Sequence, residues 1–86
     1  MYLIKIKPSA KNDLKKIKRS PLEKSFLEII DQLKRNPFEP NQSFEKLVPP
    51  VAEKYSRRIN VQHRVVYTVD EKNKVVTIYS AWSHYE

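Results

Sequence analysis

The chain has 86 residues, a length that suits one small domain, and we treat residues 1–86 as that domain. Its 17 lysines and arginines outnumber its 10 aspartates and glutamates, and the formal net charge of +7 favours polyanionic partners, above all nucleic acid. The absence of cysteine and glycine excludes disulfides, thiolate metal sites and glycine-rich phosphate loops, so we expect neither a metal nor a nucleotide cofactor.

The start of the chain predicts a β-strand. Apolar residues alternate with lysines from Met1 to Lys7, and Pro8 ends the pattern because proline has no amide hydrogen for a ladder. The stretch never becomes the unbroken apolar run of a signal peptide or a membrane span. We therefore expect a cytoplasmic protein that does not associate with membranes.

Two helices are predicted next. Ser9 is the expected N-cap of a helix that runs to Arg19, and Ser20 is the expected N-cap of a second helix with Pro21 at its first position. The second helix should stop at Asn36, because the residue before a proline resists the α conformation. Apolar residues recur at helical spacing in both segments: Ala10, Leu14 and Ile17, then Leu22, Phe26, Ile29, Ile30 and Leu33. The short connection predicts a helical hairpin.

The rest of the chain predicts four strands. A short strand over 44–48 precedes two prolines, which is typical of a sheet edge. Strands over 54–60, 64–70 and 74–82 should then form an antiparallel meander. The predicted fold is therefore α+β, in the order β-α-α-β-β-β-β, with the N-terminal helical hairpin packed on one face of a twisted antiparallel sheet.

Three arginines lie close to the predicted turn between the strands over 54–60 and 64–70. Arg58 and Arg64 flank the turn, so we expect them on the same solvent-facing side of the sheet, whereas alternation directs Arg57 to the other side. Two guanidinium groups without a local carboxylate form a site for phosphate. The alternative is that these arginines are solvated or pair with acids elsewhere in the chain.

Other polar residues could complete a catalytic site beside these arginines. Glu45 lies in the short edge strand, and His84 and Tyr85 follow directly after the last strand. Metal-free RNA cleavage needs a base for the ribose 2′-OH, cations for the phosphate transition state and an acid for the leaving oxygen. Taken singly, Glu45 is by default a surface acid, and the His-Tyr pair is by default the end of a strand.

The motif Tyr55-Ser-Arg-Arg-Ile-Asn-x-x-His-Arg-Val-Val-Tyr-x-Val69, with Phe44-Glu-Lys-Leu47 upstream and His84-Tyr85 downstream, resembles the YoeB/Txe branch of the RelE-like toxins. The resemblance extends over nearly the whole chain. It implies a RelE-like fold and the toxin half of a type II toxin–antitoxin pair. The implied activity is that of a ribosome-dependent endoribonuclease that cuts mRNA in the A site and leaves a cyclic phosphate.

The resemblance also implies roles for individual residues. Glu45 corresponds to a general base, Arg64 to the residue that stabilises the transition state, His84 to the acid and Tyr85 to the residue that orients the substrate. Which of Glu45 and His84 is base and which is acid stays open, because their pKa values depend on burial. The expected RNA-binding residues are Arg58, Arg57 and Lys46, although in a regular strand Lys46 would point to the other face.

The implied partners are a cognate acidic antitoxin of the YefM/Axe type, the ribosome with its RNA, and mRNA. Operator DNA would be reached only through the antitoxin, and the oligomeric state stays open between monomer and homodimer. Two alternatives keep the fold without the activity. One is a non-catalytic basic module like the ParE toxins that target gyrase. The other is a toxin inactivated by Glu86 and by its altered loop over 40–44.

Overall fold

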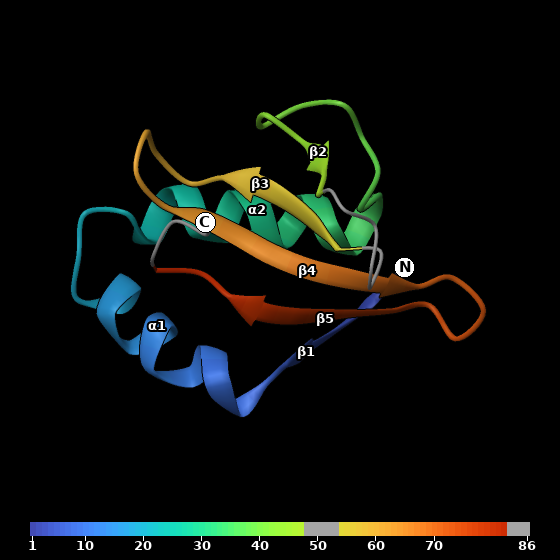
Figure 1. The fold of residues 1–86 in the computed structure, drawn as a ribbon, viewed down its shortest axis with the longest axis horizontal. Helices are drawn as coiled ribbons and strands as arrows, with labels where there is room; N and C mark the ends of the chain where they lie inside the picture. Colours follow the sequence, from blue (N-terminus) through green and yellow to red (C-terminus); the bar gives the residue numbers. More distant parts are fainter. Residues whose placement is uncertain (48–53, 83–86) are drawn as a thin grey trace.

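The computed structural model describes residues 1–47 and 54–82. In chain order its elements are β1 (Leu3–Ile6), α1 (Pro8–Lys18), α2 (Glu23–Arg35), β2 (Glu45–Lys46), β3 (Tyr55–Arg58), β4 (Arg64–Asp70) and β5 (Val75–Ser80). Figure 1 shows α2 crossing behind β3 and β4, so the sheet has a helix-covered face and an opposite face, which we call the open face. The predicted α+β class and element order are confirmed.

The five strands form one sheet in the order β1-β5-β4-β3-β2. From β2 to β5 each strand is antiparallel to its neighbour in the sheet. β1 instead runs parallel to β5, with Leu3 opposite Val75 and Ile6 opposite Ile78. The sheet is therefore mixed rather than antiparallel throughout.

Helix α1 begins two residues earlier than expected. Lys7 is its N-cap and makes no side-chain capping bond, while Pro8 takes the first helical position, where its missing amide hydrogen costs nothing. Ser9, the predicted cap, lies inside the helix, and its hydroxyl donates a hydrogen bond of 3.1 Å to the backbone oxygen of Tyr79. Ser9 thus ties α1 to β5 instead of capping the helix.

Helix α2 begins later than expected and ends where expected. The Ser20 hydroxyl accepts a hydrogen bond of 3.1 Å from the Leu22 amide, as a capping serine does, but residues 20–22 form a turn and α2 starts only at Glu23. At the other end, Asn36 is extended, with φ −158° and ψ 101°. The predicted stop before Pro37 is confirmed.

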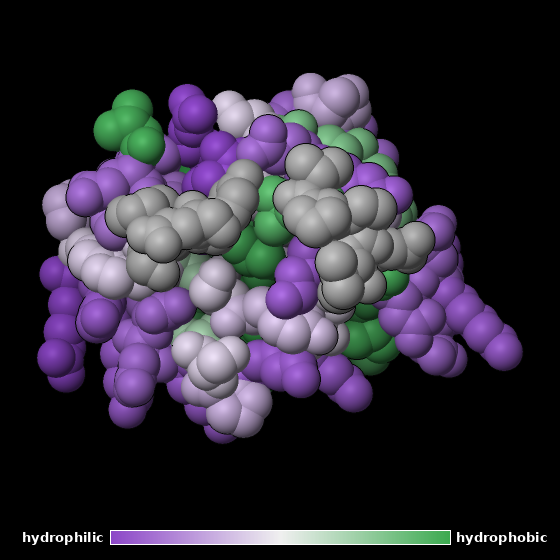
Figure 2. All heavy atoms as spheres, viewed as in Figure 1, coloured by the Kyte–Doolittle hydropathy of each residue, from purple (hydrophilic) through white to green (hydrophobic). Residues whose placement is uncertain are grey.

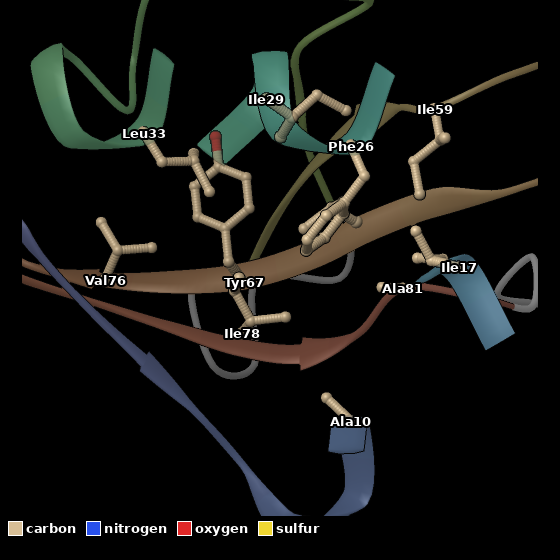
Figure 3. Packing of buried hydrophobic residues seen from close by; sticks show 11 residues of the cluster. Ala10, Ile17, Phe26, Ile29, Leu33, Ile59, Tyr67, Val76, Ile78 and Ala81 are labelled. Atoms are coloured by element: carbon tan, nitrogen blue, oxygen red, sulfur yellow. The ribbon is translucent and has the colours of Figure 1, made fainter. Parts of the chain in front are cut away.

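The hydrophobic core lies between the helices and the covered face of the sheet (Figure 3). Its buried members are Ala10, Ile17, Phe26, Ile29, Leu33, Ile59, Val65, Tyr67, Val76, Ile78 and Ala81. β4 and β5 supply the central floor of this core, since their alternate residues face α1 and α2. No helix in the described parts of the chain is long and apolar enough to cross a bilayer.

Candidate active site

Strand register places three candidate residues, Glu45 of β2, Arg58 of β3 and Arg64 of β4, on the open face. Arg58 and Arg64 are direct partners across β3 and β4, and directly opposed residues of antiparallel strands share a face. The prediction that these two arginines project to one side is confirmed. Glu45 is the direct partner of Ser56, which lies two residues before Arg58 on β3. A carboxylate from the edge strand and two arginines are therefore gathered on one surface.

The guanidinium of Arg64 is fixed in place beside Glu45. Its Nε donates to Ser56 Oγ at 3.0 Å, and its Nη2 donates to the backbone oxygen of Ser43 at 2.8 Å. Nη2 also lies 3.4 Å from Glu45 Oε1. The Arg64 side chain is 13% exposed and that of Glu45 is 53% exposed, so the cation is held by the protein while the carboxylate remains accessible to a ligand.

The loop that leads into β2 has an unusual backbone. Gln42 and Ser43 both have φ of 54°, in the left-handed region that is costly for residues with a Cβ. Two contacts hold this conformation: the Arg58 amide donates to the Gln42 oxygen at 2.8 Å, and Arg64 binds the Ser43 oxygen. The loop delivers the chain to Glu45, so its conformation determines where that carboxylate lies.

Arg57 holds the beginning of the same loop through hydrogen bonds inside the protein. It is 0% exposed, and its Nη2 donates to the backbone oxygens of Pro37 and Glu39, each at 2.9 Å. Its Nη1 donates to the Asn41 backbone oxygen at 2.9 Å and to Asn41 Oδ1 at 2.7 Å, and its Nε donates to Tyr67 Oη at 3.1 Å. Because these acceptors occupy the guanidinium, Arg57 does not reach the open face, and its predicted RNA contact stays a prediction without support from this position.

No carboxylate pairs with Arg57 among residues 1–47 and 54–82. Backbone carbonyl dipoles and the ring of Phe44, whose centroid is 4.8 Å from the guanidinium carbon, surround the charge instead. Phe44 also stacks on Tyr55, with ring centroids 5.7 Å apart. Strand alternation alone would have identified Arg57 as inward-facing, since it places this residue on the same side as the buried Ile59.

Tyr67 belongs to this buried network and gives it a pH dependence. Its hydroxyl donates to the Pro37 oxygen at 2.7 Å, and burial raises its pKa from 10.0 to about 12, although the charge of Arg57 acts in the opposite direction. Between pH 10.0 and about 12, Tyr67 has lost its phenolic proton in the unfolded chain and keeps it in the folded protein. The stabilisation from Tyr67 is therefore complete below pH 10.0 and is lost as the pH rises towards about 12.

We expect the free energy of unfolding to fall more steeply with pH above pH 10.0 in the wild type than in a Tyr67→Phe variant. The phenylalanine has no proton to release, so only the other titrating groups affect it. Urea unfolding at a series of alkaline pH values measures both curves. Parallel curves for the two proteins would show that Tyr67 does not titrate differently in the folded and unfolded states.

Lys46 does not share the face of Glu45. It pairs with Tyr55, whose side chain packs against the aromatic rings on the covered side of the sheet. The reason is the two-residue period of a strand, which sends neighbouring side chains to opposite faces. The RNA contact predicted for Lys46 stays a prediction, and among the three predicted RNA-binding residues only Arg58 lies on the open face.

The predicted catalytic residues His84 and Tyr85 lie outside the described residues, as do Val48 and Glu86. The chain before them is firmly anchored. Asp13 Oδ2 accepts a hydrogen bond of 3.1 Å from the Ala81 amide. Trp82 stacks on His63, with ring centroids 4.4 Å apart. This stacking holds residue 82 beside the residue that precedes Arg64.

The surface seen in Figure 2 is mostly hydrophilic, with hydrophobic atoms in its central part, on its right side and in one group at the upper left. Within residues 1–47 and 54–82, no three histidine, aspartate or glutamate side chains are close enough together to hold a metal ion. The groups that these residues bring together are an accessible carboxylate and two arginines. Such a set suits proton transfer and charge stabilisation at a phosphodiester.

Residues 5–85 match the family described as YoeB-like toxin of bacterial type II toxin-antitoxin system. Among solved structures, the YoeB dimer of Staphylococcus aureus is 34% identical, with 98% of each chain covered and a TM-score of 0.83. A YoeB/ParE toxin from Agrobacterium tumefaciens is 26% identical, with 96% of this chain and 99% of the other covered and a TM-score of 0.86.

Two complexes are also similar to this chain. The toxin in the heterotetrameric YoeB-YefM complex of Staphylococcus aureus is 34% identical over 99% of both chains, with a TM-score of 0.81. A chain of the archaeal RelE-RelB complex from Pyrococcus horikoshii is 27% identical, with 95% of this chain and 93% of the other covered and a TM-score of 0.75. Comparison with curated protein sequences gives no significant match.

Proposed function

Because this chain belongs to the YoeB-like toxins of bacterial type II toxin–antitoxin systems, we propose that it is a ribosome-dependent endoribonuclease that cleaves mRNA in the A site. The observation that carries the proposal is the placement of Glu45 Oε1 3.4 Å from Arg64 Nη2 on the open face. A carboxylate and a fixed guanidinium at this distance supply a proton acceptor and a charge stabiliser to the same phosphodiester.

The proposed reaction is attack of the ribose 2′-oxygen on the adjacent phosphorus. One of Glu45 and His84 takes the 2′-OH proton, and the other gives a proton to the departing 5′-oxygen. The bond from phosphorus to the 5′-oxygen breaks, and the products are a 2′,3′-cyclic phosphate and a free 5′-OH. No metal or cofactor takes part in this scheme.

The arginines and Tyr85 complete the proposed site. Arg64 donates to the non-bridging phosphate oxygens as negative charge grows in the transition state, and its contacts with Ser56 and Ser43 keep it aimed before the substrate binds. Arg58, its direct partner across the strands, adds a second phosphate contact. Tyr85 orients the substrate.

The proposed partners follow from the family and from the charge of the chain. Staphylococcus aureus YoeB is found in a complex with YefM, so we propose an antitoxin of the YefM type as the natural inhibitor here. An acidic antitoxin segment suits a chain with a net charge of +7. The YoeB dimer of the same bacterium supports a homodimer as a second form of this protein. The proposed site of action is the cytoplasm, where the ribosomes are.

The test is cleavage of a defined mRNA by the purified protein with and without translating ribosomes. We expect new 5′-OH ends within the A-site codon and cyclic phosphates on the upstream fragments, only when ribosomes are present. His84→Ala should abolish these ends while the variant stays folded by circular dichroism. Growth arrest by His84→Ala equal to that by the wild type, with no mRNA cut by either, would favour the non-catalytic ParE-like alternative.

A further inference from the structure

A cluster of one tyrosine and two lysines lies beside the proposed site. The Nζ atoms of Lys7 and Lys54 lie 5.1 Å and 4.6 Å from the centre of the Tyr79 ring. We call these three residues the Tyr79 cluster. They come from three separate parts of the chain, namely the residue that caps α1, the residue before β3, and β5. Both ammonium groups are attracted to the negative face of the ring.

Tyr79 lies at a β-bulge. β4 pairs Tyr67 with Ile78 and Val66 with Ser80, so Tyr79 is the extra residue in β5. Strand alternation directs its ring to the open face, because it lies two residues after Thr77, the partner of the open-face residue Thr68. The lysines that precede β3 and α1 meet the ring there.

Lys54 connects the Tyr79 cluster to the proposed site through a row of polar residues along β3. The Leu47 amide donates to the Lys54 backbone oxygen at 2.9 Å, so the β2–β3 ladder extends to Lys54. Lys54, Ser56 and Arg58 then follow at two-residue steps of roughly 7 Å along one face. Ser56 is the direct partner of Glu45, so Lys54 is one such step from the position of the proposed reaction.

The charge of this cluster is unbalanced within the described residues. The salt bridge found in residues 1–47 and 54–82 joins Arg64 to Glu45, and neither Lys7 nor Lys54 pairs with a carboxylate there. Two ammonium groups at one ring repel each other, and a phosphate bound at either group would offset that repulsion. A phosphate matches this arrangement because lysine binds phosphate as a point charge.

We propose that the Tyr79 cluster binds the sugar-phosphate backbone of single-stranded RNA next to the scissile nucleotide and so guides mRNA across the open face. The role of this contact in cleavage rests on the proposed function, but the binding itself is measurable without any cleavage. RNA is favoured over an acidic peptide because the cations continue at strand spacing into Arg58 and Arg64. Basic grooves with aromatic rings are the usual way in which proteins track a single strand.

The first experiment measures binding of a short fluorescent RNA whose 2′-hydroxyls are all methylated, so that it cannot be cut. Fluorescence anisotropy at several KCl concentrations gives the affinity and its salt dependence. For Lys7→Gln/Lys54→Gln we expect the slope of log affinity against log salt to become shallower by about 1.4, which corresponds to two lost phosphate contacts. A matched control is Lys24→Gln/Lys34→Gln, two exposed lysines of α2 with the same change in net charge.

The control should keep the wild-type slope, because its lysines lie on the helix that covers the other face of the sheet. Equal slopes for the wild type, the cluster variant and the control would overturn the proposal. So would a cluster variant that binds RNA normally and loses binding only to an acidic peptide. A Tyr79→Leu variant tests the role of the ring. Its affinity for the RNA should fall about tenfold, while its circular dichroism spectrum stays unchanged. An RNA affinity equal to that of the wild type would contradict the proposal.

Cleavage on ribosomes, measured with the same proteins, separates this proposal from the proposed function. If the wild type cuts mRNA and the cluster variant binds and cuts equally well, the Tyr79 cluster has no role and the proposed function stands. If the cluster variant loses RNA affinity but the wild type cuts nothing, the Tyr79 cluster is an RNA site and the nuclease proposal fails. A cluster variant that binds RNA weakly and cuts slowly supports both.

Discussion

Replacement of Glu45 by glutamine is expected to slow mRNA cleavage on ribosomes by about 10²- to 10⁴-fold, the usual contribution of a general acid or base. The amide has the shape of the carboxylate and can still accept a hydrogen bond from Arg64, which lies 3.4 Å away. It cannot take up a proton at neutral pH. The loss should therefore appear in the rate at saturating ribosome concentration, while the affinity for ribosomes changes little.

A suitable control for Glu45→Gln is Glu28→Gln, which removes the same charge from an exposed position on α2. This variant should cleave at the wild-type rate. Quenched-flow or primer-extension kinetics on programmed ribosomes would measure both variants. If Glu45→Gln cut mRNA as fast as Glu28→Gln, Glu45 would have no role in proton transfer and the proposed assignment of this residue would be abandoned.

Replacement of Arg57 by methionine is expected to lower the free energy of unfolding by at least about 3 kcal/mol. Methionine fills a similar volume but removes the charged hydrogen bonds that Arg57 donates to the backbone oxygens of Pro37, Glu39 and Asn41. A hydrogen bond to a charged group contributes about 1.5–3 kcal/mol, and several are lost together. Thermal unfolding should show this as a fall in Tm of roughly 4–8 °C per kcal/mol.

The neighbouring Arg58→Met is the matched control for Arg57→Met, because it removes the same charge one residue along β3. Arg58 is exposed on the open face, so this variant should keep the wild-type Tm and lose RNA cleavage instead. Arg57→Lys should also lower Tm, since one ammonium group cannot reach acceptors arranged for a planar fork. Equal Tm values for Arg57→Met and the wild type would show that the buried network adds little to stability.

Local patterns in the sequence predict most of the fold. The period-2 alternation of the last strands and the stop before Pro37 correspond to elements of the structure. The same alternation is compatible with parallel or antiparallel pairing, so it gives no information on the direction of β1 relative to β5. The sequence predicts the start of α1 two residues late, because Ser9 is a typical N-cap residue but Pro8 occupies the first helical position.

The candidate site is predictable to the extent that it depends on strand register. Arg58 and Arg64 were placed together from the turn that they flank, and the structure pairs them directly. Arg57 and Lys46 were assigned to RNA from their charge and from a family motif, although their places in the alternation put them on the covered face. The buried network around Arg57 involves contacts across 16 to 20 residues with loop carbonyls, which no short-range pattern reveals.

The parallel pairing of β1 with β5 also determines when the protein can acquire its structure during synthesis. Residues 3–6 are made early, but their partners in the sheet are residues 75–78. A nascent chain therefore holds β1 without a neighbour, and it lacks the buried Val76 and Ile78, until those residues leave the exit tunnel. The chain on the ribosome thus keeps an unfinished core until Ile78 has left the exit tunnel, and until then the sheet that carries Glu45 and Arg64 is incomplete.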